Sequence, residues 1–345
     1  MYEQHTYIDG NTTIWLPPKH FPVYFYFMAF FAYFGAGEIG IRIITWLTLF
    51  PLLFLLRKLT DVKDEQMLIL LLMLFFLDPI LIEINYIGKF DQFAIMFMIA
   101  GIYLMTKERP FEAGFLIALG TLAKFQPFFA YLAGVIVYVR RKQWNAIIKL
   151  SISCLGTTLL SLVYLYKTYG EDFTQVIDFQ ATRKTPNLSF WYYILPDNYS
   201  TDLLLVLQLI FYLLIGISSL FLVSHKFDHS LLLITSYLNA AFIIGSSQYY
   251  STYSYFFTLP FIPIFIEYIQ NGKLKHLSPF IFSIGFYFLG LLLCYNSCYP
   301  TINPFTYISA TGITLISIST VSFLYSFIYT SIQDRKESRN LKSAT

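Results

Sequence analysis

Charged residues and cysteines are scarce in this sequence. Asp, Glu, Lys and Arg make up 12% of the 345 residues, whereas a soluble domain carries roughly 25%. Only three residues are cysteine, and two of them, Cys294 and Cys298, flank a predicted helix end. That spacing allows a disulfide, although two unpaired thiols are the simpler interpretation. The shortage of charge argues against a soluble globular protein.

Several motifs that carry catalysis or cofactors are missing as well. The sequence has no Walker A loop, no G-x-G-x-x-G at a strand–helix turn, no H-E-x-x-H and no C-x-x-C pair. Its five histidines are scattered, and His225 and His229, although spaced as on one helix face, fall in a predicted loop. We therefore expect no bound cofactor and no metal site, and the sequence leaves a divalent metal requirement open.

Hydrophobic residues, at 57% of the chain, come in blocks separated by short polar loops. Blocks of about 15 to 24 residues are typical of helices that cross a hydrocarbon core of about 30 Å. We predict an all-α, polytopic integral membrane protein with about eleven transmembrane helices, plus an interfacial helix over the aromatic residues 21–36. They form one domain over residues 1–333, and a charged cytoplasmic tail follows over 334–345. The predicted spans are 39–57, 66–82, 90–106, 111–123, 125–140, 146–166, 203–223, 230–246, 253–269, 278–296 and 307–330.

Lys and Arg fall mainly on alternate loops. Sixteen of the 23 lie on one side of the predicted helices, and the positive-inside rule places that side in the cytoplasm. The N-terminus is polar and lacks the basic region that begins a cleavable signal peptide. We expect a protein of the plasma membrane or endoplasmic reticulum with a cytoplasmic C-terminus. The outer face then receives loops 1–38, 83–92 and 167–202, with the N-x-[ST] sequons at Asn11, Asn187 and Asn198.

The stretch from Leu77 to Pro127 holds charged residues in or beside strongly hydrophobic sequence. A charge near hydrocarbon is costly, so such residues are usually paired or functional. An outer carboxylate can act as a general base toward an acceptor hydroxyl. Lys and Arg at the same level can hold a lipid-linked phosphate. The charged residues concerned are Asp78, Glu83, Lys89, Asp91 and Lys124.

Each of these residues also has a purely structural interpretation. Asp78 precedes a proline and could cap or kink a helix, while Glu83 and Lys89 could form a surface ion pair of little energetic value. Asp91 could be an N-cap, and Lys124 could be a lysine that reaches to the membrane surface. The residues alone leave these alternatives open.

The order of several motifs resembles the GT-C glycosyltransferases, which are multi-spanning enzymes that use polyprenyl-phosphate sugars. The motifs are Asp78-Pro79, Gly88-Lys89-Phe90-Asp91, the basic turn Lys107–Arg109, Ala113 to Ala118, and Lys124-Phe125-Gln126-Pro127. Further segments fit the same order, namely Tyr2–Tyr7, Tyr169-Gly170, Arg183, Asn187–Phe190, Ser247–Tyr249 and Leu259-Pro260. The chain is most similar to the first mannosyltransferase of GPI-anchor synthesis and to polyprenyl-phosphate-mannose α-mannosyltransferases, over most of residues 1–265.

This resemblance implies an inverting membrane glycosyltransferase. It would move a hexose, most of all mannose, from a dolichyl- or polyprenyl-phosphate donor to a lipid-linked or glycan acceptor on the extracytoplasmic face. The implied partners are membrane lipid, the lipid-linked sugar, the acceptor and a small membrane subunit, with no nucleic acid. The candidate catalytic residues are Asp9 and Asp91, and the candidate substrate-binding residues are Lys124, Arg183, Asp78, Glu83, Gln126, Asn187 and Gln248.

One departure from the family pattern concerns the base. In the family, an acidic pair usually lies at the end of the first helix, and the aligned segment here would precede Met1. Three interpretations follow: the start is assigned too late, Asp9 or Glu3 supplies the base, or the protein is an inactive relative. Two other classes stay open, a non-catalytic GT-C-like subunit of a glycosylation complex and a lipid or sugar transporter, although no internal repeat of the transporter kind is visible.

Overall fold

The computed structural model divides into two compact units. The first covers 1–55, 75–134 and 143–184, and the second covers 56–74, 135–142 and 185–345. The single domain predicted over 1–333 stays a prediction, and the predicted tail 334–345 lies outside the described residues. The structure describes residues 5–9, 12–16, 33, 37–60, 65, 68–69, 71–72, 91–170, 201–224, 226–245, 255–271, 329 and 332.

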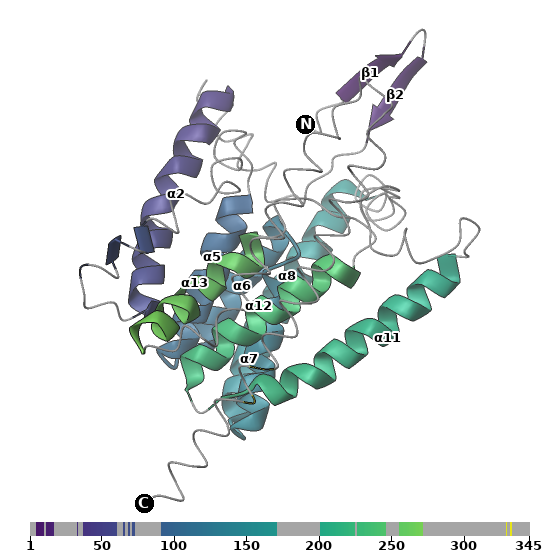
Figure 1. Ribbon diagram of the computed structural model, residues 1–345. Helices are drawn as coiled ribbons and strands as arrows, with labels where there is room; N and C mark the ends of the chain where they lie inside the picture. Colours follow the sequence, from purple (N-terminus) through teal and green to yellow (C-terminus); the bar gives the residue numbers. More distant parts are fainter. Residues whose placement is uncertain are drawn as a thin grey trace, which may run out of the picture. The chain divides into compact units, whose positions relative to one another are not determined.

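Every regular element that the structure describes from Gly37 onward is a helix. Each α-helix coincides with a predicted span, with ends that differ by a few residues. The predicted spans 66–82, 278–296 and 307–330 and the predicted interfacial helix fall almost wholly outside the described residues. The helices (Figure 1) are α2 (Gly37–Thr60), α5 (Asp91–Thr106), α6 (Pro110–Ala123), α7 (Phe128–Arg140), α8 (Trp144–Tyr169), α11 (Thr201–Ser219), the 3-10 helix η1 (Leu220–Leu222), α12 (Phe227–Gly245) and α13 (Tyr255–Gln270).

A short β-hairpin precedes the helices, and the all-α prediction did not include it. Strand β1 (His5–Asp9) pairs antiparallel with β2 (Thr12–Leu16), and Asp9 lies opposite Thr12. β2 is rich in β-branched and aromatic residues, which favour strands. The two residues between the strands, a glycine and an asparagine, are of types favoured in tight hairpin turns. From the sequence, this stretch was expected to be part of the polar outer loop 1–38.

Within the described residues, two helices are long and apolar enough to cross a membrane, over Trp144–Thr168 and Leu203–Leu222. Both expose large aliphatic side chains, such as Leu160 on α8 (72% exposed) and Leu209 on α11 (71% exposed). Extended exposed apolar faces mark sites of membrane or protein contact. The count of eleven spans stays a prediction. Shorter apolar helices among the described residues cover Asp91–Thr106, Pro110–Ala123, Phe128–Arg140 and Phe256–Gln270.

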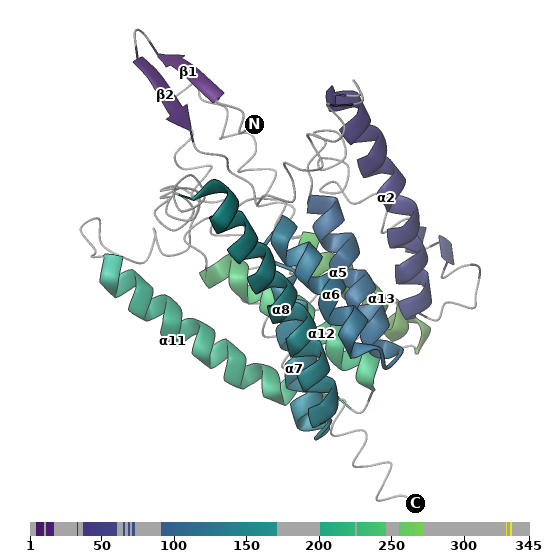
Figure 2. The same ribbon diagram turned by 180° about the vertical axis from the view of Figure 1, so that it is seen from behind.

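In the first unit, α6 packs against both α5 and α8, and the three helices run side by side (Figures 1 and 2). Glycine permits a close approach of α6 to α8. A Cβ atom added to Gly114 would lie 2.5 Å from the carbonyl oxygen of Leu150 and 3.0 Å from the backbone nitrogen of Cys154. Membrane helices commonly use small residues in this way, because the backbones can then come close.

α5 and α6 form an antiparallel hairpin through the basic turn at residues 107–109. The N–H of Arg109 donates to the Leu104 carbonyl (3.0 Å), and the N–H of Glu108 donates to the Met105 carbonyl (3.1 Å). This is the Schellman pattern of helix termination, and it places Glu108 in the left-handed region, with φ 58°. Glycine is the residue that usually occupies this position, because a Cβ atom is disfavoured there.

We expect Glu108→Gly to raise the stability of the protein by about 1 kcal/mol, because it relieves the left-handed strain of a residue with a Cβ atom. Glu108→Ala is the matched control, since it removes the same carboxylate and keeps the Cβ atom. Thermal unfolding in detergent measures both variants. An equal gain in both would show that the charge of Glu108, rather than its backbone conformation, sets the effect.

In the second unit, α12 contacts both α11 and α13. Every residue of α12 from His229 to Ala241 is buried. Polar contacts join α12 to α11, since the amide Nε2 of Gln208 donates to the Gly245 carbonyl at 2.8 Å. α12 is therefore an inner helix of this unit, while α11 presents much of its surface outward.

Candidate functional site

The chain breaks between α6 and α7 at residues 124–127. Lys124 has an extended backbone (φ −157°, ψ 144°), although its N–H still donates to the Gly120 carbonyl at 2.8 Å. Pro127 has no N–H and cannot extend the hydrogen bonding of α6. α7 begins at Phe128, whose N–H donates to the Phe125 carbonyl at 3.0 Å. The break therefore forms a compact turn that reverses the chain.

This break lies beside the first turn of α5. A Cβ atom on Gly120 would lie 3.0 Å from the Ala94 carbonyl oxygen and 3.1 Å from the Pro127 ring carbons Cβ and Cγ. The same side of Gly120 therefore faces both the first turn of α5 and the turn before α7. We refer to residues 91–94 and 120–127 as the α5–α6–α7 junction.

Asp91 and Lys124 form an ion pair across this junction, through the carboxylate Oδ1 and the amine Nζ. Their side chains are 9% and 22% exposed. Asp91 begins α5 and Lys124 follows the last residue of α6, so each charge also lies at the helix end whose dipole favours it. Asp91 is therefore more than an N-cap, and Lys124 is more than a lysine that reaches to the membrane surface, because the two side chains form an ion pair with each other.

Two carboxamides lie next to these charged residues in the chain. Gln92 is fully buried and Gln126 is 3% exposed. Within the described part of the chain, neither Oε1 nor Nε2 of Gln92 has a hydrogen-bond partner, and Oε1 of Gln126 has none. A buried polar group without a partner costs about 1–3 kcal/mol. The junction thus holds hydrogen-bonding capacity that the described protein atoms do not use.

Aromatic side chains come directly after Lys124 in the chain, in the turn and in the first residues of α7. Phe125 is 42% exposed, stacks on Phe128 with ring centroids 5.6 Å apart, and meets Phe129 edge-on at 5.5 Å. Such rings present flat apolar surface next to the polar junction. The arrangement suits a ligand that is polar at one end and apolar at the other.

The structure brings together three of the residues predicted for the site, which are Asp91, Lys124 and Gln126. Asp9 lies at the end of β1. Sequence reasoning missed Gln92, although a carboxamide next to Asp91 at the start of an apolar helix was a usable signal. The other predicted residues lie outside the described residues, and they are Asp78, Glu83, Arg183, Asn187 and Gln248.

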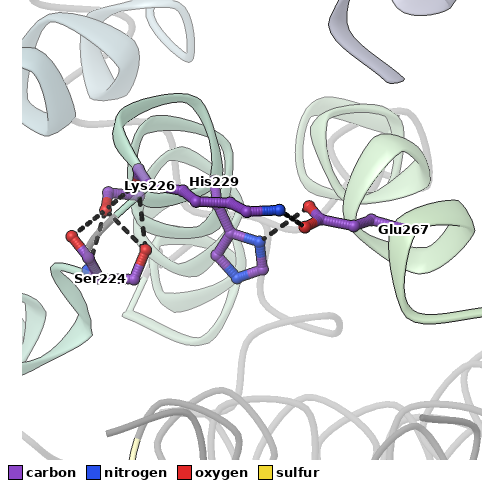
Figure 3. A network of polar contacts seen from close by, with 5 residues as sticks. Ser224, Lys226, His229 and Glu267 are labelled. Atoms are coloured by element: carbon purple, nitrogen blue, oxygen red, sulfur yellow. Dashed lines mark hydrogen bonds and ion pairs between the residues drawn. The ribbon is translucent and has the colours of Figure 1, made fainter. Parts of the chain in front are cut away.

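A second polar cluster joins α12 to α13 (Figure 3). Glu267 of α13 pairs with Nζ of Lys226 through Oε1, and lies 3.3 Å from Nδ1 of His229 through Oε2. Ser230 closes the start of α12, because its hydroxyl accepts from the Ser224 N–H at 2.9 Å and donates to the Lys226 carbonyl at 2.8 Å. Placing His229 in a loop was wrong, since α12 begins at Phe227 and His229 is buried.

The two clusters differ in how far water reaches their ion pairs. The Lys226 side chain is 71% exposed and Glu267 is 30% exposed, so water reaches much of that pair. The Asp91–Lys124 pair is drier and lies beside the unpartnered carboxamides. Within the described ranges, no three His, Cys, Asp or Glu side chains come close enough to hold a metal ion. The α5–α6–α7 junction is therefore the stronger candidate for a binding site.

Comparison with known proteins supports the coarser part of the sequence resemblance, which is to a glycosyltransferase, and leaves the mannosyltransferase families as a prediction. A family model described as Glycosyltransferase family 87 matches residues 20–246, which is about two thirds of the chain. The matched range includes the whole α5–α6–α7 junction. It also includes Lys226 and His229 of the second cluster, but not Glu267. No curated protein and no solved structure matches the chain significantly.

Proposed function

We propose that this chain, which belongs to glycosyltransferase family 87, transfers a hexose from a polyprenyl-phosphate donor to an acceptor hydroxyl. The family supports the coarser part of the sequence prediction, which is a membrane glycosyltransferase. Mannose as the sugar, the lipid-linked or glycan acceptor, and inversion at the anomeric carbon belong to the proposal.

The observation that carries the proposal is the Asp91–Lys124 pair within the α5–α6–α7 junction. A lysine amine at the end of apolar helices can bind the single negative charge of a phosphodiester. The exposed ring of Phe125 next to it can contact the isoprenoid chain or a sugar face. A lipid-linked sugar phosphate combines these chemical features in one molecule.

In the proposed reaction, the acceptor oxygen forms a bond to the anomeric carbon while the bond from that carbon to the phosphate oxygen breaks. The acceptor proton goes to a carboxylate, for which Asp91 and Asp9 are the candidates. The electron pair of the broken bond stays on the phosphate, whose negative charge increases as the sugar leaves. Lys124 would stabilise that added charge, and this contribution is larger in the transition state than in the bound donor.

We place the reaction on the extracytoplasmic face. The junction lies at the opposite end of the α5–α6 hairpin from the basic turn Lys107–Arg109. Because basic loops are retained in the cytoplasm, the junction would face outward, together with the loops predicted to be outside. The active site would then meet donor lipid delivered within the membrane plane.

A transfer assay tests the proposal directly. The purified protein in lipid vesicles is supplied with radiolabelled polyprenyl-phosphate mannose, glucose or galactose and with a membrane lipid extract as acceptor. We expect label to move from the donor to a new glycolipid or glycan, with mannose as the preferred sugar. Label that enters the vesicles without transfer would indicate a transporter. No transfer and no uptake in the presence of all three donors would indicate a non-catalytic subunit, and either result would overturn the proposal.

A further inference from the structure

We propose that Gln92 and Gln126 bind hydroxyl groups of the donor sugar, next to the phosphate held by Lys124. This inference rests on the proposed function and deepens it, because it assigns the sugar subsite. It makes Gln92 a specificity-determining residue, and it predicts that the junction recognises a hexosyl phosphate as one unit.

The two carboxamides belong to one small region. Gln92 lies between Asp91, which pairs with Lys124, and Ala94, whose carbonyl oxygen meets Gly120. Gln126 lies between Lys124 and Pro127, whose ring packs against the same side of Gly120. Both glutamines are therefore flanked by residues that touch across the junction.

The unpartnered atoms determine which ligand chemistry fits. Two buried acceptors have no hydrogen-bond partner among the described residues, namely Oε1 of Gln92 and Oε1 of Gln126. The buried donor Nε2 of Gln92 also has no partner among them. A carbonyl oxygen needs a ligand that can donate a proton. A phosphodiester has only acceptors and an isoprenoid chain has neither kind of group, whereas a sugar hydroxyl both donates and accepts. The sugar is thus the part of the donor that complements both glutamines.

The expected selectivity follows from the same burial. A site built around buried hydrogen-bonding groups rejects a ligand that lacks the matching group, because those groups then stay unpaired. Gln92 is fully buried and so cannot turn to solvent when the hydroxyl is missing. Loss of one such contact is expected to lower kcat/KM by about 10- to 100-fold.

The test separates sugar binding from phosphate binding. Gln92→Met and Gln126→Met keep the length of the side chain and remove the amide. Each variant, as the full-length protein in detergent, is assayed for kcat/KM with the hexosyl donor and for the Ki of sugar-free polyprenyl phosphate as a competitor. We expect kcat/KM to fall by about 10- to 100-fold and the Ki to stay within about twofold. Lys124→Gln should instead raise the Ki, because it removes the phosphate contact.

Asn239→Leu provides a matched control. Asn239 is 1% exposed on α12, and its Oδ1 also lacks a partner within the described residues, but it lies in the other unit. We expect its donor kcat/KM to match that of the wild type. A second measurement needs no variant: the wild type should discriminate against at least one singly deoxygenated hexosyl donor by about 10-fold or more.

Two results would overturn the inference while leaving the proposed function intact. One is a wild type that transfers sugar, together with methionine variants that both have the same kcat/KM as the wild type. The other is equal use of all deoxygenated donors. A wild type that neither transfers sugar nor binds sugar-free polyprenyl phosphate would overturn the proposed function itself, and the inference with it.

Discussion

Asp91→Asn and Lys124→Gln are each expected to lower sugar transfer by at least about tenfold, because a positioned acid–base or charged group is typically worth about 10²–10⁴ in rate. Both changes remove the charge and keep a polar side chain. Asn matches the size of Asp, and the Gln side chain is one bond shorter than that of Lys. In each single variant the remaining charge is left in a mostly buried position, since the two side chains are 9% and 22% exposed. Initial rates with saturating acceptor, normalised to folded protein, measure the effect.

Loss of activity in the single variants could arise from damage to the fold, because breaking a buried ion pair on one side is strongly destabilising. The double variant, Asp91→Asn with Lys124→Gln, distinguishes the two causes. It leaves no unpaired charge, so its thermal stability should return toward that of the wild type. Its transfer rate should stay low, because neither the carboxylate nor the amine is present. A double variant that regains both stability and activity would show that the pair is only structural.

The Lys226–Glu267 pair gives a matched control for the loss of a charge pair. Lys226→Gln removes a cation of the same type, bonded to a carboxylate on another helix. The Lys226 side chain is 71% exposed, and exposed ion pairs are worth only about 0–1 kcal/mol. We expect its transfer rate to be close to that of the wild type. A loss equal to that of Lys124→Gln would mean that charge pairs matter here for folding in general.

The ion pair could be predicted in part from the sequence. Asp91 and Lys124 stood out because each lies beside strongly hydrophobic residues, where an unpaired charge is costly. They also lie at nearly equal distances along the chain from the turn Lys107–Arg109. In an antiparallel helical hairpin, residues placed in this way come to the same end. The pairing could therefore be predicted from the geometry of a helical hairpin, although neither residue alone indicated its partner.

Other features depended on tertiary structure. Residues 227–230 are mostly polar and resemble a loop, yet they form the first turn of α12, where Glu267, distant in the sequence, supplies a partner for the buried His229. The burial of Gln92 likewise requires packing around the start of α5 that local sequence does not encode. The helices themselves were predictable, because long apolar blocks in a membrane chain leave helix as the simplest way to satisfy the backbone.

Gly114→Ala is expected to destabilise the protein by about 1–3 kcal/mol, as overpacking of a close helix contact does. The added Cβ would lie 2.5 Å from the Leu150 carbonyl oxygen and 3.0 Å from the Cys154 nitrogen. Both obstacles are backbone atoms of α8, so no side-chain rotation can relieve them. α6 and α8 would have to separate, and Lys124 at the end of α6 would move with the helix. The unfolding temperature in detergent and the transfer rate should both fall.

Gly156→Ala is the matched control, because the same substitution is made on α8 where nothing lies within 4 Å of the added Cβ. Alanine favours a helix over glycine by roughly 0.5–1 kcal/mol, so this variant should be as stable as the wild type or slightly more so. The two substitutions are thus expected to change stability in opposite directions. If Gly114→Ala were also neutral or stabilising, α6 and α8 would not be in close backbone contact.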